Sequence, residues 1–184
     1  MRKLILQMMI SVDGYFEGPA REIDWHNVDA EFNEQALDLI SRVDLMLFGR
    51  VTYELMAGYW PTDSARGDDP MVAAAMNNTE KIVFSSTLNK ADWEHTRLVK
   101  SDAAVEIRKL KALPGKDMVI FGSSDLGASL LEAGLIDEIH IVVAPILLGA
   151  GKPLFKGMRR RVPLKLLSVR QFKNENVLLV FQPV

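Results

Sequence analysis

Three short segments of the chain place a glycine or hydroxyl-bearing turn directly after an apolar run that has the character of a strand. They are Phe48-Gly49-Arg50-Val51-Thr52, Phe84-Ser85-Ser86-Thr87 and Phe121-Gly122-Ser123-Ser124. In an α/β sheet, ligands bind at the carboxyl ends of the strands, and a turn that opens a helix there offers backbone N–H groups to a phosphate. One such turn is weak evidence, but three in a small chain indicate a polyphosphate ligand such as a dinucleotide.

Apolar runs and amphipathic helical patterns alternate through the first three quarters of the chain, which has 184 residues. Strands are expected at Lys3–Ile10, Leu45–Phe48, Lys81–Phe84, Arg97–Val99, Met118–Phe121 and Glu138–Ala144. Helices are expected at Asp29–Arg42, Arg50–Ala57, Met71–Asn78, Ala103–Ala112 and Asp125–Ala133. Turn-forming residues predict loops at Ser11–Ala20, Gly58–Pro70 and Pro145–Pro153. The segments that would close the chain as an antiparallel hairpin are Leu164–Phe172 and Val177–Gln182.

This alternation predicts one domain over residues 1–184. Its fold class is α/β: a three-layer sandwich in which helices cover both faces of a mostly parallel central sheet, with a C-terminal antiparallel hairpin at one edge. No internal repeat or low-complexity segment interrupts the pattern.

Composition and charge exclude several classes of partner. The formal net charge is −2, and the one basic run, Arg159-Arg160-Arg161, is too short to form the basic stripe of a nucleic-acid binder. No stretch approaches the roughly 20 apolar residues of a membrane span, and the apolar start of the chain lacks a signal-peptide cleavage site. The chain has no cysteine, which excludes thiolate chemistry and fits a reducing cytoplasm. Its three histidines show no ligand spacing, so no metal site is expected.

Each of the three turns also has an ordinary structural explanation. Gly49 allows a ligand to approach the backbone, with Arg50 and Thr52 beside a pyrophosphate, but the same residues suit a tight turn and a helix cap. The Ser85-Ser86 pair could hold the 2′-phosphate of an adenine ribose or form a hydroxyl-rich turn. The segment Gly122–Gly127 is the strongest of the three because it opens a helix after an apolar strand, although it lacks the G-x-G-x-x-G fingerprint.

Two further loops supply candidates for contact with a substrate. The segment Ser11–Tyr15 follows the first strand, where its backbone could meet a flat heteroaromatic ring or Asp13 could accept local N–H bonds. Trp25 could stack on a ring or cover the edge of the core. His26 has a pKa range suited to proton donation, although a lone histidine is more often structural.

These pieces, in this order, resemble the dihydrofolate-reductase-like fold. They are most similar to the C-terminal reductase domain of bifunctional riboflavin-biosynthesis deaminase/reductases and to standalone proteins of the dihydrofolate reductase family. The resemblance spans essentially the whole chain and rests on Ser11–Gly14, Phe48–Glu54, Lys81–Ser85, Phe121–Ser123, Gly134–Ile139 and Ala144–Gly151. The last two segments are the most specific, because that long run with its glycine-rich loop is typical of the riboflavin-reductase branch.

The resemblance implies NADPH binding along the carboxyl edge of the sheet. The backbone of Ile10 and Ser11 would hold the nicotinamide carboxamide, the turn at Gly49 the pyrophosphate, and the Ser85-Ser86 pair the 2′-phosphate. All the matching cofactor positions are Ile10, Ser11, Gly49, Arg50, Thr52, Ser85, Ser86, Gly122, Ser123, Ser124, Asp125, Leu126 and Gly127. The substrate-binding positions would be Asp13, Tyr15, Trp25, His26 and Phe32.

The expected function is therefore that of an NADPH-dependent reductase that transfers a hydride to a small pterin-, pyrimidine- or ribitylamino-type substrate. The cofactor would carry the chemistry, while the chain positions the reactants. The proton would come from water, from Asp13 as the candidate catalytic residue, or from an acid within Asp29–Glu34. None of the acids in that segment has the spacing to Gly49 that identifies the protonating acid of dihydrofolate reductases, and the zinc motif of the deaminase domain is missing.

Two alternatives keep the same scaffold. One is a non-catalytic nucleotide or small-molecule binding protein, since a fold does not determine a function. The other is a scaffolding homodimer without nucleotide affinity. For the reductase, the resemblance implies a homodimer that meets near its C-terminal part. Composition and charge predict a cytoplasmic location with no nucleic-acid or membrane partner.

Overall fold

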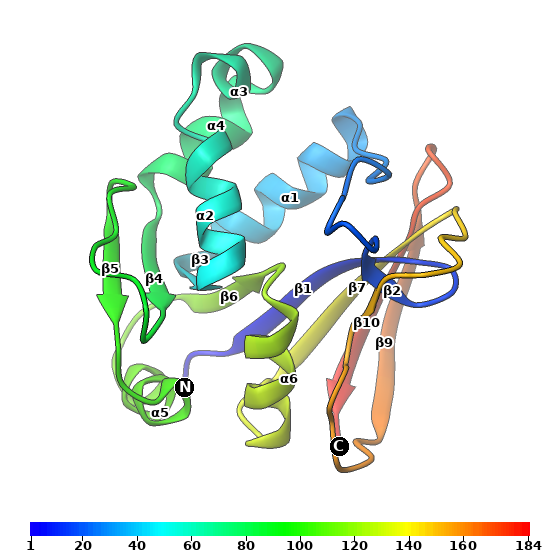
Figure 1. Ribbon diagram of the computed structural model, residues 1–184. Helices are drawn as coiled ribbons and strands as arrows, with labels where there is room; N and C mark the ends of the chain where they lie inside the picture. Colours follow the sequence, from blue (N-terminus) through cyan, green and yellow to red (C-terminus); the bar gives the residue numbers. More distant parts are fainter.

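The computed structural model describes residues 1–184 and has a large mixed sheet between two layers of helices (Figure 1). Its eight strands lie in the order β5-β4-β3-β6-β1-β7-β10-β9. Their bounds are β1 (Leu4–Ser11), β3 (Val43–Gly49), β4 (Glu80–Phe84), β5 (Thr96–Val99), β6 (Asp117–Phe121), β7 (Glu138–Ala144), β9 (Leu164–Gln171) and β10 (Val177–Pro183). A separate two-stranded sheet pairs β2 (Tyr15–Glu17) with β8 (Lys152–Pro153).

Six helices surround the sheet, namely α1 (Ala30–Arg42), α2 (Arg50–Tyr59), α3 (Asp63–Asp68), α4 (Pro70–Asn78), α5 (Ala103–Ala112) and α6 (Ser124–Glu132). In Figure 1, α5 and α6 lie on one side of the sheet and α1, α2 and α4 on the other. None of these helices combines the length and the apolar composition that a bilayer span requires.

Neighbouring strands from β5 to β7 all run parallel, and β10 and β9 then add an antiparallel edge. The α/β fold expected from the sequence is thereby confirmed. Because the parallel strands share one direction, their carboxyl ends meet at a single edge of the sheet. The ends of β3 and β6 at that edge lead directly into α2 and α6.

The core has a layer on each face of the sheet because the central strands are apolar on both faces. In β1, Leu4, Leu6 and Met8 belong to the layer under α5 and α6. Ile5 belongs to the opposite layer, which also holds buried residues of α1, α2 and α4.

Three segments expected to be loops contain regular structure, so those three predictions were wrong in part. Helix α3 forms within Gly58–Pro70, where the Thr62 hydroxyl accepts the amide of Ala65 and Ala65 itself is fully buried. Strands β2 and β8 form within Ser11–Ala20 and Pro145–Pro153 because these distant segments pair with each other. A Cβ on Gly151 would lie 2.2 Å from the Glu17 carbonyl oxygen, so glycine permits this close approach.

Candidate functional site

A groove of about 620 Å³ lies at the carboxyl edge of the sheet, where the ends of β3, β4 and β6 open toward β2. The residues that line it are Phe16, Glu17, Arg21, Gly49, Arg50, Val51, Thr52, Phe84, Ser123, Ser124, Asp125, Leu126 and Lys152. Seven of the positions predicted to bind a cofactor are among them: Gly49, Arg50, Thr52, Ser123, Ser124, Asp125 and Leu126. The structure thus brings together two of the three turns singled out in the sequence.

Two hydrogen bonds join the turn before α2 to the turn before α6. The Gly49 amide donates to the Ser123 hydroxyl over 2.8 Å, and the Ser123 amide donates to Thr52 Oγ1 over 3.1 Å. Gly122 lies between them with a φ of 66°, and a Cβ there would sit 2.9 Å from Thr52 Cγ2. The two helix starts therefore lie side by side, and glycine is required where they meet.

The two helices that begin in the groove differ from the others because no side chain caps their N-termini. Helices α1, α3, α4 and α5 are each capped by a side chain, from Asp29, Thr62, Asp69 and Asp102. Neither α2, after Gly49, nor α6, after Ser123, has a side-chain cap. Because the first turn of a helix carries N–H groups without intrahelical partners, these two N-termini offer donors and positive dipole ends to the same groove.

The hydroxyl of Ser124 adds a further unused polar group. Ser124 is 3% exposed, and its Oγ is buried without a hydrogen-bond partner although the residue lines the groove. Buried polar atoms are almost always paired, so this hydroxyl beside an uncapped helix is free to bond a ligand in the groove. The donors available here fit the oxygens of a diphosphate.

Charged side chains surround these donors. Arg50 pairs with Glu54 over 2.9 Å, and Lys152 pairs with Asp125 over 2.8 Å. Arg21 and Lys152 were missed by sequence reasoning. Lys152 directly follows the glycine-rich loop that carries the family resemblance, which is a signal that could have found it. Arg21 has no local signal, because the β2–β8 pairing brings its segment to the groove.

Other predicted cofactor positions lie outside this groove. The Ser85 hydroxyl accepts the amides of Thr87 and Leu88, so it is used within its own turn after β4, while Ser86 is exposed. Gly127 faces the sheet, where a Cβ would lie 2.6 Å from Leu6 Cδ1. The role of Ser85 and Ser86 toward a 2′-phosphate stays a prediction.

Ile10 and Ser11 end β1, which lies between β6 and β7. Ser11 Oγ donates to Asp13 Oδ1 over 2.6 Å and accepts the Tyr15 amide over 3.0 Å. Asp13 also accepts the amides of Leu148 and Gly149, at 3.2 and 2.8 Å. The Ser11 hydroxyl, followed by the amides of Gly149 and Leu148, holds the pKa of Asp13 below its ordinary value. Asp13 is therefore ionised at neutral pH and ties the glycine-rich loop to the end of β1.

The remaining predicted substrate residues gather beyond β1. Trp25 and Phe32 pack on a small core cluster that contains Phe172 from the β9–β10 hairpin. The His26 ring lies 4.5 Å from the Trp25 ring, and its Nε2 is buried without a partner. Burial lowers the pKa of His26 to about 4, so this ring is neutral at physiological pH.

The acids considered as proton donors are mostly engaged elsewhere. Asp29 caps α1 through the Phe32 amide. Glu31 accepts hydrogen bonds from the Lys173 amide and the Arg170 guanidinium, and these lower its pKa. No cluster of three or more histidine or carboxylate side chains with metal-site geometry occurs in the structure.

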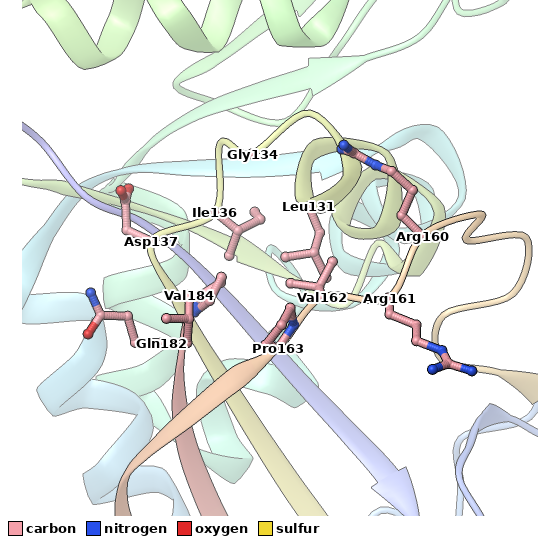
Figure 2. A pocket seen from close by; sticks show the side chains of 11 residues that line it. Leu131, Gly134, Ile136, Asp137, Arg160, Arg161, Val162, Pro163, Gln182 and Val184 are labelled. Carbon is pink, nitrogen blue, oxygen red and sulfur yellow. The ribbon is translucent and has the colours of Figure 1, made fainter.

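A second hollow, of about 450 Å³, lies near the opposite end of the sheet, beside the residues that precede β7. Figure 2 shows the apolar side chains of Leu131, Ile136 and Val162 gathered at its centre, with Arg160 and Arg161 extending away from it. It includes none of the predicted site residues, and its arginines do not converge on a common point.

The family model described as the RibD C-terminal domain matches residues 2–178. The chain belongs to this family. A relative named uncharacterized protein YyaP, from Bacillus subtilis (strain 168), is 31% identical over 180 residues, covering 98% of this chain and 94% of its own length.

Solved structures show the same fold. A putative riboflavin biosynthesis protein from Shewanella sp. PV-4 has a TM-score of 0.75 at 24% identity, over 100% of this chain and 99% of its own. The Thermotoga maritima diaminohydroxyphosphoribosylaminopyrimidine deaminase/5-amino-6-(5-phosphoribosylamino)uracil reductase has a TM-score of 0.71 at 17% identity. The match covers 100% of this chain and 57% of that chain. Enterococcus faecalis dihydrofolate reductase, complexed with NADP(H) and RAB-propyl, has a TM-score of 0.65 at 15% identity. The match covers 98% of this chain and 96% of that chain. The RibD C-terminal domain thus shares the dihydrofolate-reductase-like fold.

Proposed function

We propose that this RibD C-terminal domain protein is an NADPH-dependent reductase that transfers a hydride to a small pterin-, pyrimidine- or ribitylamino-type substrate. The observation that carries the proposal is the pair of uncapped N-termini, of α2 and α6, which face one groove beside the orphaned Ser124 hydroxyl. Membership of the family supports a reductase of the pyrimidine or riboflavin type.

In this proposal the groove residues bind and orient the cofactor. The amide groups that start α2 and α6 would bind its diphosphate, and the backbone at Ile10 and Ser11 would hold its nicotinamide. The bound cofactor supplies the hydride. The chain places the substrate beside the end of β1, near Tyr15 and the Trp25 cluster, and limits the access of water.

Most of the acids considered as proton donors are already engaged in hydrogen bonds within the protein. Asp13 is held ionised and bonded to two amides, and Asp29 and Glu31 are bonded to α1 and Arg170. Glu34 is exposed and has no bonded partner. We therefore favour water or Glu34 as the proton source over Asp13, Asp29 and Glu31.

A second candidate is a non-catalytic nucleotide or small-molecule binding protein on the same scaffold. The engagement of Asp13, Asp29 and Glu31 favours it, because a reductase that protonates its substrate needs a free acid or a guided water. Steady NADPH oxidation with a pterin, pyrimidine or quinone acceptor would exclude this alternative.

We further propose a cytoplasmic homodimer that assembles through β9. This strand is a free edge of the sheet, and a long, exposed apolar edge is a template for pairing with another chain. Its exposed apolar residues are Leu164, Leu166, Leu167 and Val169. Light scattering after size exclusion should give a dimer for the wild type and a monomer for Leu167→Lys; a wild-type monomer at micromolar concentration contradicts the proposal.

The first experiment for the proposed function is a titration with NADPH and, separately, NADH, followed by tryptophan quenching and nicotinamide emission. Micromolar NADPH affinity with weaker NADH affinity is expected. Acceptors would then be screened by the loss of NADPH absorbance. The absence of binding to either nucleotide at millimolar concentration would refute the reductase proposal and leave the fold unaffected.

A further inference from the structure

Three cations line the groove, and two of them already have acidic partners. Arg50 is paired with Glu54, and Lys152 with Asp125. The guanidinium of Arg21 has no hydrogen bond or ion pair within the protein, although it belongs to the same lining. Arg21 therefore carries the uncommitted positive charge of this groove.

The backbone places Arg21 in an unusual conformation. Its φ is 67°, in the left-handed region that favours glycine, and only His95 and Glu175 share this feature among the other non-glycine residues. The turn is held by hydrogen bonds from the Gly18 amide to the Glu22 carbonyl and from the Arg21 amide to the Gly18 carbonyl, at 3.0 and 2.9 Å. Strained residues of this kind persist where the surrounding structure enforces them, and they often mark ligand sites.

The same groove offers further hydrogen-bond donors that have no partner within the protein. It contains the uncapped start of α6 and the buried, unpaired Ser124 hydroxyl. Phe16 and Glu17 of β2 line the groove together with Arg21, and β8, which pairs with β2, contributes Lys152 beside Asp125 of α6. An anionic group bound in this groove would be able to accept from the guanidinium, the hydroxyl and the helix amides.

We propose that Arg21 binds the diphosphate of the dinucleotide in this groove, together with the start of α6. The segment from Tyr15 to Glu22 and the start of α6 then form a clamp on the diphosphate, with Arg21 as the charged contact of that segment. This inference rests on the proposed function for the identity of the ligand. The diphosphate is preferred over the 2′-phosphate because Arg21 shares the groove with the α6 start, whereas Ser85 and Ser86 lie outside it.

The test compares Arg21→Gln with Arg161→Gln, a matched control in which another arginine without a side-chain partner is removed at the opposite end of the sheet. The dissociation constants for NADPH and NADH should each rise about tenfold or more in Arg21→Gln, since a charge-assisted hydrogen bond is lost. Arg21→Lys should recover part of the affinity, and Arg161→Gln should match the wild type. Equal affinities of Arg21→Gln and wild type, or a loss for NADPH alone, overturn the diphosphate clamp while the reductase proposal stands.

Inorganic pyrophosphate separates this inference from the proposed function. Calorimetric titration should show binding to the wild type that Arg21→Gln weakens and Arg161→Gln does not. If the wild type binds pyrophosphate in this way but neither nucleotide, the proposed function fails and the anion site at Arg21 stands. If the variants do not differ in pyrophosphate binding, the inference fails.

A glycine variant distinguishes ligand binding from a role in folding. Arg21→Gly removes the side chain and relieves the left-handed backbone, so its Tm should not fall while its nucleotide affinity does. Glu175→Gly is the backbone control, because it relieves the same conformation in the β9–β10 hairpin and should leave affinity unchanged. A lower Tm for Arg21→Gly together with weaker binding would assign Arg21 a structural role and overturn the proposal.

Discussion

The Gly49 amide donates a hydrogen bond to the Ser123 hydroxyl over 2.8 Å, across a sequence separation of 74 residues. The reciprocal bond from the Ser123 amide to Thr52 completes a short cross-link between the starts of α2 and α6. Two helix N-termini repel each other through their dipoles, so they need such a link to remain adjacent. The groove depends on this pair because it keeps the uncapped starts of both helices at the same groove.

Ser123→Ala is expected to lower the free energy of unfolding by about 1–2 kcal/mol, because the Gly49 amide loses its acceptor. Urea denaturation measures the change. Ser129→Ala, an exposed serine on the same helix without a side-chain hydrogen bond, is the control and should be nearly neutral. Equal stabilities of the two variants would show that the cross-link contributes nothing.

Asp125→Asn is expected to tighten NADPH binding by about threefold, since the carboxylate lies in the first turn of α6 and also engages Lys152. Removing its charge frees Lys152 and reduces repulsion of the phosphates, and the gain should shrink at high salt. Asp92→Asn, which breaks the exposed Lys90–Asp92 pair, is the matched control and should not alter affinity. Weaker binding in Asp125→Asn would instead give the carboxylate a favourable contact with the ligand.

Asp13→Asn separates a catalytic role for Asp13 from a structural one. The carboxylate accepts amides of the glycine-rich loop, so the amide side chain should loosen that loop and lower the Tm. Hydrogen exchange at Leu148 and Gly149 should accelerate relative to the wild type. A slower turnover with unchanged Tm, exchange and NADPH affinity would point to Asp13 as the acid instead.

The stability of the protein should fall in mild acid because of His26. Its pKa is lowered from 6.5 to about 4, so between these pH values the unfolded chain binds a proton that the folded chain does not. The protonation of His26 therefore leaves the free energy of unfolding unchanged above pH 6.5. It lowers that free energy by up to about 3 kcal/mol as the pH falls to 4. Denaturation at a series of pH values should show this slope reduced in His26→Gln and retained in His95→Gln, where the replaced histidine is exposed. An unchanged slope in His26→Gln would refute the assignment.

The sequence predicted the helix starts that line the groove better than it predicted the lining residues Arg21 and Lys152. The turns at Gly49 and Ser123 follow apolar strands directly, so the pattern that marks them is local. Arg21 reaches the groove because β2 pairs with β8, and no local pattern reveals a pairing between segments so far apart. Lys152 arrives through the same pairing, and only its place after the glycine-rich loop marks it in the sequence. Asp13 was recognised as important, but its partners on the glycine-rich loop could not be inferred from spacing.

The strand order has a consequence for how the chain folds as it is made. Strand β1 is synthesised first, yet its neighbours β6 and β7 come from the last half of the chain, with Leu4 beside Met118 and Ile5 beside Glu138. Such long-range parallel pairing is slow to form. Until it forms, the apolar side chains on both faces of β1 lack their native partners. A nascent chain halted before β7 would expose this strand with at least one open edge, so we expect folding to finish late in translation and to benefit from a chaperone that shields the N-terminal strand.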